Sequence, residues 1–83
     1  MKEPIFTIEE LTALGFQELD GDMLDDGGSY KWWAYNKNNN ELHITYQFTN
    51  KSEFEVGYIE FNGEQLKGRE ITKKDVEFLM ELM

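Results

Sequence analysis

The chain has 83 residues, no cysteine and a formal charge of −9, and 40% of its residues are hydrophobic and 14% aromatic. This composition predicts one small folded domain, residues 1–83, and it excludes disulfides, thiolate metal sites and thiol nucleophiles. The lack of cysteine fits a reducing compartment, and no stretch approaches the roughly 20 apolar residues that cross a bilayer, so we expect a cytoplasmic protein with no membrane partner.

The negative charge is concentrated in the first third of the chain. Residues 1–29 hold eight acidic residues and one basic residue, whereas residues 30–83 hold nine acidic and seven basic residues. Such a field repels phosphate groups and anionic lipids, and it accelerates association with a basic protein surface. We therefore expect a protein partner with a basic surface and no direct nucleic-acid partner.

Near-identical helix-start signals lie at the two ends of the chain. In Thr7-Ile8-Glu9-Glu10 and in Thr72-Lys73-Lys74-Asp75, the threonine hydroxyl can accept a hydrogen bond from the backbone N–H three residues on. The acidic side chain at that position can accept one from the N–H of the threonine, which completes a capping box. Hydrophobic staples flank both starts, formed by Phe6 with Leu11 and by Ile71 with Val76.

The first helix is expected from Thr7 to about Leu14, where Gly15 ends it, and the second from Thr72 toward Met83. Each helix carries one apolar stripe. The stripe residues are Ile8, Leu11 and Leu14 in the first helix and Val76, Leu79, Met80 and Met83 in the second. Neither helix is long enough to be stable alone, so both must cover an apolar sheet face.

The middle of the chain has the pattern of β-strands. A short strand is expected at residues 16–19, followed by a loop rich in aspartate and glycine at residues 20–29. Two longer strands, residues 30–36 and 41–49, are joined by an asparagine-rich turn at residues 37–40. In the second of these strands apolar and polar side chains alternate, which predicts one buried and one solvated face.

The tight loop after that strand sets the pairing of the next one. It would place Phe54 opposite Phe48, and by the same register Val56 opposite Tyr46. Ile59 and Phe61 are an odd number of residues from Phe54 and Val56, so in a regular strand they would point to the opposite face of the sheet. The alternation of faces along this strand must therefore shift by one residue. We expect a β-bulge at Gly57 to supply it.

Asn62-Gly63 is the strongest hairpin signal, and a two-residue turn there pairs Ile59 with Leu66. The predicted fold is α+β, a two-layer sandwich of an antiparallel, four- to five-stranded meander with the N-terminal and C-terminal helices on one sheet face, in the order α-β-β-β-β-β-α. The alternative is that the helices lie on opposite faces of the sheet, because the alternation places several aromatic residues on the face away from the core.

Two adjacent tryptophans define a candidate surface. A turn of even length at residues 37–40 pairs Trp33 with Ile44 in the core and leaves Trp32 on the opposite face with His43, whereas an odd length exchanges the two indoles. The indole off the core either covers the sheet edge or packs under the acidic loop, or it anchors a partner, since aromatic residues are enriched in binding hot spots. The candidate partner-binding residues are Trp32, His43, Asp22, Asp25 and Asp26.

The sequence holds no motif for catalysis. His43 is the only histidine, neither Ser29 nor Ser52 lies in a G-x-S-x-G setting, and we expect no enzyme. Residues 20–27 fit no calcium-loop register, and Gly27-Gly28 lacks the spacing and the lysine of a phosphate-binding loop. No cofactor and no specific metal site are therefore expected, and a weak divalent-ion site in the acidic loop is kept as an alternative.

The expected function is a small acidic protein-interaction module, an inhibitor, adaptor or regulator of a cytosolic protein, in keeping with a short bacterial, phage or mobile-element protein. A structural protein that self-assembles, for example as a homodimer through a strand edge or the methionine-rich second helix, is the alternative. A DNA-mimicking inhibitor is a further alternative, although the basic residues after residue 29 count against it. Binding of a small ligand by aromatic stacking would require a concavity that sequence does not reveal.

Overall fold

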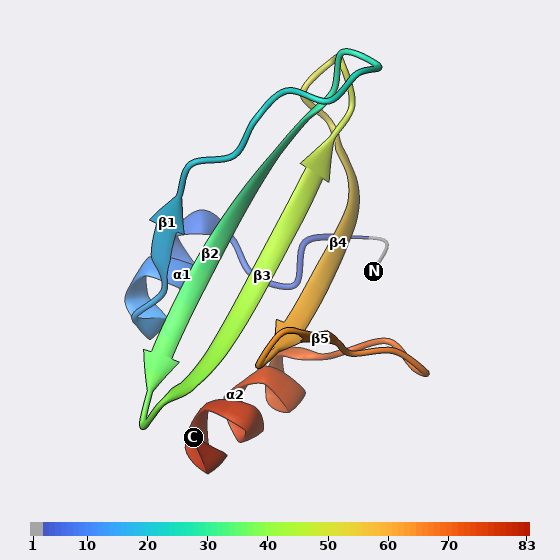
Figure 1. Ribbon diagram of the computed structural model, residues 1–83. Helices are drawn as coiled ribbons and strands as arrows, with labels where there is room; N and C mark the ends of the chain where they lie inside the picture. Colours follow the sequence, from blue (N-terminus) through green and yellow to red (C-terminus); the bar gives the residue numbers. More distant parts are fainter. Residues whose placement is uncertain (1–2) are drawn as a thin grey trace.

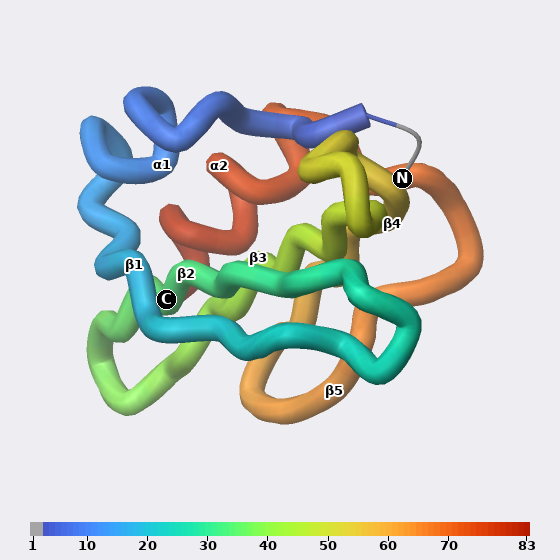
Figure 2. Tube along the Cα trace, turned by 90° about the horizontal axis from the view of Figure 1, so that it is seen from above, coloured from blue at the N-terminus to red at the C-terminus, as the bar shows by residue number. Residues whose placement is uncertain are grey.

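The computed structural model describes residues 3–83 and confirms the predicted α+β fold. Its elements are α1 (Ile8–Leu14), β1 (Gln17–Leu19), β2 (Ser29–Lys37), β3 (Asn40–Phe48), β4 (Phe54–Phe61), β5 (Glu64–Gln65) and α2 (Lys73–Leu82). Within the described residues, five antiparallel strands follow one another across a single sheet in chain order (Figure 1). Both helices lie over the same face of this sheet, so the alternative with helices on opposite faces is excluded (Figure 2).

Both helices begin at the predicted capping boxes. Thr7 Oγ1 accepts from the Glu10 N–H at 3.1 Å, and Glu10 Oε1 accepts from the Thr7 N–H at 2.9 Å. In α2, Thr72 Oγ1 accepts from the Asp75 N–H at 3.3 Å, and Asp75 Oδ2 accepts from the Thr72 N–H at 2.8 Å. These bonds satisfy backbone donors that have no partner inside the helix.

One hydrophobic core lies between the helices and the sheet. Its fully buried side chains come from both layers: Trp33, Leu11, Leu42, Ile44 and Val76. The stripe predicted for α2 is confirmed, since Val76 and Met83 are buried and its other two residues, Leu79 and Met80, are half-buried. The stripe predicted for α1 is wrong at Ile8, which is 49% exposed, because this short helix packs on the core through Leu11 and leaves its first turn at the surface.

The register between β2 and β3 is the predicted one. Trp33 lies opposite Ile44 and Tyr35 lies opposite Leu42. The connecting turn is shorter than expected but still even in length. Asn38 and Asn39 alone form it, with φ angles of 51° and 66° that asparagine tolerates better than most residues.

The β-bulge between β3 and β4 is displaced from its predicted position. Phe54 lies opposite Phe48 as expected, but Val56 lies opposite Gln47, and the register shift occurs before Gly57 is reached. Gly57 instead faces Tyr46 across the ladder. Gly57 is buried and lies in the regular part of the ladder, after the bulge.

The final hairpin matches the sequence prediction. Asn62 and Gly63 have φ angles of 51° and 86°, and the Leu66 N–H donates to the Ile59 carbonyl at 2.8 Å. Among residues 3–83, no helix is long and apolar enough to cross a membrane.

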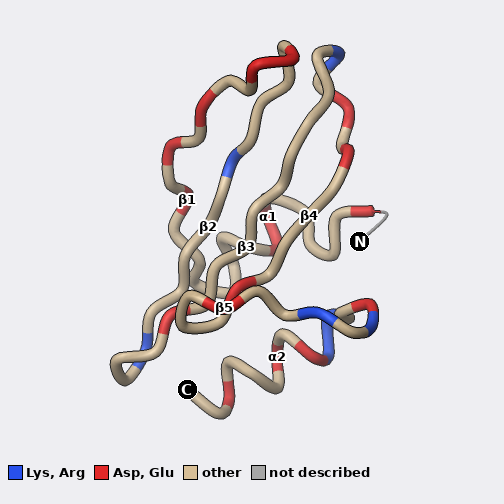
Figure 3. Tube along the Cα trace, turned by 45° about the vertical axis from the view of Figure 1, so that its right-hand side comes forward, with Lys and Arg blue, Asp and Glu red and all other residues tan. Residues whose placement is uncertain are grey.

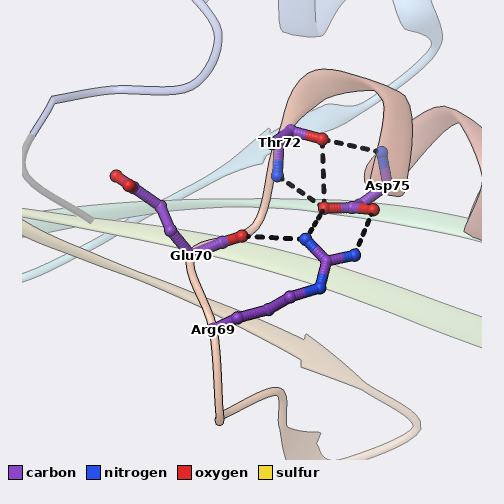
Figure 4. A network of polar contacts seen from close by, with 4 residues as sticks. All are labelled: Arg69, Glu70, Thr72 and Asp75. Carbon is purple, nitrogen blue, oxygen red and sulfur yellow. Dashed lines mark hydrogen bonds and ion pairs between the residues drawn. The ribbon is translucent and has the colours of Figure 1, made fainter.

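An ion pair that sequence analysis missed ties the start of α2 to the segment before it (Figure 4). Arg69 binds the Asp75 carboxylate through two hydrogen bonds, Nη1 to Oδ2 at 2.9 Å and Nη2 to Oδ1 at 2.7 Å. The Arg69 guanidinium, with further help from the Thr72 N–H, holds the pKa of Asp75 well below its ordinary value. The carboxylate that completes the capping box is therefore also the acceptor of the arginine.

We expect the stabilising effect of Asp75 to disappear in acid. Because the carboxyl pKa is lower in the folded than in the unfolded chain, its contribution is complete above the ordinary carboxyl pKa of about 4 and is lost as the pH falls toward the folded value. Urea unfolding of wild type and of Asp75→Ala checks this. The wild type is expected to be more stable at neutral pH, and the difference is expected to shrink between about pH 4 and pH 2. A difference that stays constant over this range would contradict the assignment.

Candidate functional site

The sheet face opposite the helices is a half-buried surface that carries aromatic side chains. In the described part of the chain no helix covers it (Figure 2). Successive strands contribute residues that pair across the ladder and share this side. We call them the open face: Tyr30, Trp32, Ala34, His43, Thr45, Gln47, Val56, Tyr58 and Glu60.

Trp32 is held in place on the β2 side of the open face. Its Nε1 donates to the Asp20 carbonyl at 3.0 Å, and its ring meets the His43 ring edge-on with a centroid separation of 5.1 Å. The predicted division of the two indoles is confirmed, because Trp33 is 1% exposed in the core while Trp32 is half-buried on the other face. His43 Nε2 also lies 3.6 Å from Glu41 Oε2, so a carboxylate borders the pair.

The acidic loop between β1 and β2 lies against the edge of β2. The Tyr30 N–H donates to the Asp22 carbonyl at 3.1 Å, and Met23 bridges to Ser29. Only glycine permits this approach: a Cβ at Gly21 would lie 1.6 Å from the Tyr30 carbonyl oxygen. The loop is thus fixed by backbone contacts.

The predicted acidic residues fall into two places. Asp22 lies beside Tyr30, close to the open face, and its Oδ1 accepts from the Met23 N–H at 2.7 Å. Asp25 and Asp26 are exposed in the loop, next to Gly27, where a Cβ would lie 3.3 Å from Asn50 of the β3–β4 connection. Figure 1 shows the tip of the loop beside this connection. Figure 3 shows acidic residues following the loop to this tip.

The tip is distant from the centre of the open face. The tip lies beyond Ser29, which pairs with Phe48 at the end of β3. His43 is five residues from Phe48 on the same strand, a distance of roughly 16 Å at the usual rise per residue. The structure therefore brings Trp32, His43 and the Asp20–Asp22 segment together, and it places Asp25 and Asp26 apart from them.

Sequence reasoning missed other surface residues. Val56 joins the open face because the bulge precedes Gly57, a shift that the alternation alone did not locate, whereas Tyr58 lies on this face with the bulge at either position. On α2, Phe78 and Leu82 are 59% and 65% exposed. Their spacing of one helical turn outside the buried stripe was the signal that could have identified them.

The described residues offer binding surfaces but no cluster of metal ligands. No group of three or more histidine, cysteine, aspartate or glutamate side chains within residues 3–83 is arranged to hold a metal ion. Comparisons with models of known protein families, with curated proteins and with solved structures found no match to this chain. Its function is therefore inferred from its own surfaces.

Proposed function

We propose that this chain is a protein-interaction module that binds a basic surface of a partner protein through the open face, with Trp32 as the main anchor. The observation that supports this most directly is the indole itself. It is half-buried in a sheet face without a covering helix, its N–H is already bonded to Asp20, and its ring is fixed against His43. A rigid aromatic ring of this kind is the usual centre of a binding hot spot.

Charge supports the choice of a basic partner. The chain carries −9, and residues 1–29 hold eight of its acidic residues, among them Asp22 beside the open face. Opposite charge on a partner raises the association rate and orients the encounter. Repulsion between two such acidic chains disfavours a homodimer through this face. A role as inhibitor, adaptor or regulator and a cytoplasmic location belong to the same proposal.

The experiment is capture of partners from the native host with the full chain as bait. Wild type is compared with Trp32→Ala and with the matched variant Phe78→Ala, which removes an aromatic ring that is 59% exposed on α2. We expect Trp32→Ala to weaken binding of a specific partner at least about tenfold, a typical hot-spot effect, and Phe78→Ala to leave it unchanged.

Two further measurements make the result decisive. Circular dichroism must show that both variants remain folded, and added salt is expected to slow association with the partner. Equal capture by wild type and Trp32→Ala would contradict the proposal. Loss of capture by Phe78→Ala alone would move the interface to α2, and concentration-dependent dimerisation by sedimentation would favour self-assembly.

A further inference from the structure

Two aromatic rings and two carboxylates lie together on the side of the sheet away from the helices. The rings of Trp32 and His43 meet edge-on, with 5.1 Å between their centroids. Glu60 lies directly opposite His43 in the ladder, where Cβ atoms are about 5 Å apart, and Glu41 Oε2 lies 3.6 Å from His43 Nε2. Both carboxylates therefore border the ring pair, and we call these four residues the Trp32 site.

The two carboxylates of this site have no lysine or arginine partner within residues 3–83. The ion pairs that described lysine and arginine residues form all involve other carboxylates, and the approach of His43 to Glu41 is too long for a hydrogen bond. No open-face position is a lysine or arginine. Four of the chain's eight basic residues lie instead within residues 67–74, before and at the start of α2 (Figure 3). The negative charge of Glu41 and Glu60 is thus available to a cation from a partner.

The Trp32 side chain is half-buried, and its single polar atom is already used. Its Nε1 donates to the Asp20 carbonyl, which fixes the ring and leaves no donor for a partner. What the side chain still offers is the π surface of its ring. That surface attracts cations, and indole is the aromatic group that attracts them best. Ring and carboxylates therefore favour the same kind of ligand group.

We propose that the Trp32 site binds an arginine side chain of the partner protein, an inference that rests on the proposed function. The guanidinium would lie on the ring pair, and its edge would donate to Glu41 and Glu60. A planar guanidinium stacks on an aromatic ring while its N–H groups remain free to bind carboxylates at its edge. The ammonium of lysine is a compact point charge without such a flat surface, so the combination of ring and carboxylates favours arginine.

The test probe is a short peptide in which arginine alternates with serine, titrated into the full chain at constant ionic strength. Matched peptides carry lysine, or citrulline, which has the shape of arginine without its charge. Resonances of the Trp32 indole and the His43 ring report binding, and the indole of Trp33, which is 1% exposed in the core, is the internal reference. We expect saturable shifts at Trp32 and His43 and none at Trp33. The arginine peptide is expected to bind at least about threefold more tightly than the lysine peptide and about tenfold more tightly than the citrulline peptide.

Two results of this titration would overturn the proposal. One is the absence of a saturable shift at Trp32 with the arginine peptide. The other is equal binding of the arginine and lysine peptides, which would show that the site responds to charge alone.

Variants locate the bound cation. Glu41→Gln and Glu60→Gln are each expected to weaken binding of the arginine peptide about threefold, the effect of an exposed ion pair. The matched variant Glu81→Gln removes the same charge from an exposed position on α2, on the other side of the sheet, and is expected to leave binding unchanged. Equal weakening by all three variants would assign the attraction to net charge and overturn the site. Trp32→Leu is expected to lose the preference for arginine over lysine. If Trp32→Leu does not fold, the peptide series on wild type decides.

This inference and the proposed function can fail separately. If Trp32→Ala abolishes partner capture but the peptides show no preference for arginine, the open face remains the interface and the arginine assignment is wrong. If partner capture does not depend on Trp32, the proposed function is wrong even when the arginine peptide binds as expected.

Discussion

Replacing Leu11 with alanine is expected to lower the free energy of unfolding by about 2–5 kcal/mol, the usual cost of truncating a buried leucine. Leu11 is 0% exposed and is the residue through which α1 enters the core. A helix of seven residues has little stability of its own, so the loss of this side chain weakens the docking of the whole helix. Since a domain of this size has a total stability of roughly 4–12 kcal/mol, the change is a large fraction of it.

Ile8→Ala is the matched control on the same helix. Ile8 is 49% exposed, so its truncation is expected to change the free energy of unfolding by no more than about 0.5 kcal/mol. Urea unfolding followed by circular dichroism and by tryptophan fluorescence measures both variants. Similar losses for Leu11→Ala and Ile8→Ala would show that the helix does not depend on the side chain that we place in the core.

Tyr46→Phe is expected to cost about 2–4 kcal/mol, because it leaves two buried backbone groups without partners. The Tyr46 hydroxyl donates to the Phe6 carbonyl at 3.0 Å and accepts from the Phe6 N–H at 3.2 Å. These bonds connect residues that are 40 positions apart and fasten the N-terminal segment to the sheet. The variant is therefore expected to accelerate hydrogen exchange at the Phe6 amide.

A pH effect accompanies this contact. Burial raises the pKa of Tyr46, so the folded chain keeps the phenolic proton at pH values where the unfolded chain has released it. Stability is therefore expected to fall as the pH rises above about 10, the ordinary tyrosine value, and Tyr46→Phe is expected to lack this component. Tyr58→Phe, on the open face, serves as the control. If it reproduced the stability loss of Tyr46→Phe, the bonds to Phe6 would not be its cause.

The parts of the fold that sequence predicted are those set by local rules. Both capping boxes need only residues three apart, and the β2–β3 register needs only the alternation of apolar residues and an even turn. The errors at Ile8 and at Gly57 arose from packing. The exposure of Ile8 depends on how far a short helix extends past the core. The position of the bulge depends on how β4 pairs with β3, where the register already shifts between Gln47 and Phe48.

The candidate site shows the same division. Because neighbouring residues of a strand point to opposite faces, the sequence predicted that one of the two indoles lies off the core. The even length of the β2–β3 turn makes that indole Trp32. The contact between Phe6 and Tyr46 could not be predicted, because it forms only once the N-terminal segment has folded over the sheet. Such a contact between distant segments leaves no periodic signal in the sequence.

Gly21 and Gly28 have a consequence for how the acidic loop meets a partner. Both lie where a Cβ would collide with a backbone carbonyl of the sheet, at 1.6 Å from Tyr30 O and 2.5 Å from Phe48 O. The backbone that carries the carboxylates of the acidic loop is therefore held against the sheet before a partner binds. Binding at the loop then costs little conformational entropy. Exchange of the Leu24 and Gly27 amides, which donate to backbone carbonyls, is accordingly expected to be slow in the free chain and nearly unaltered in the complex.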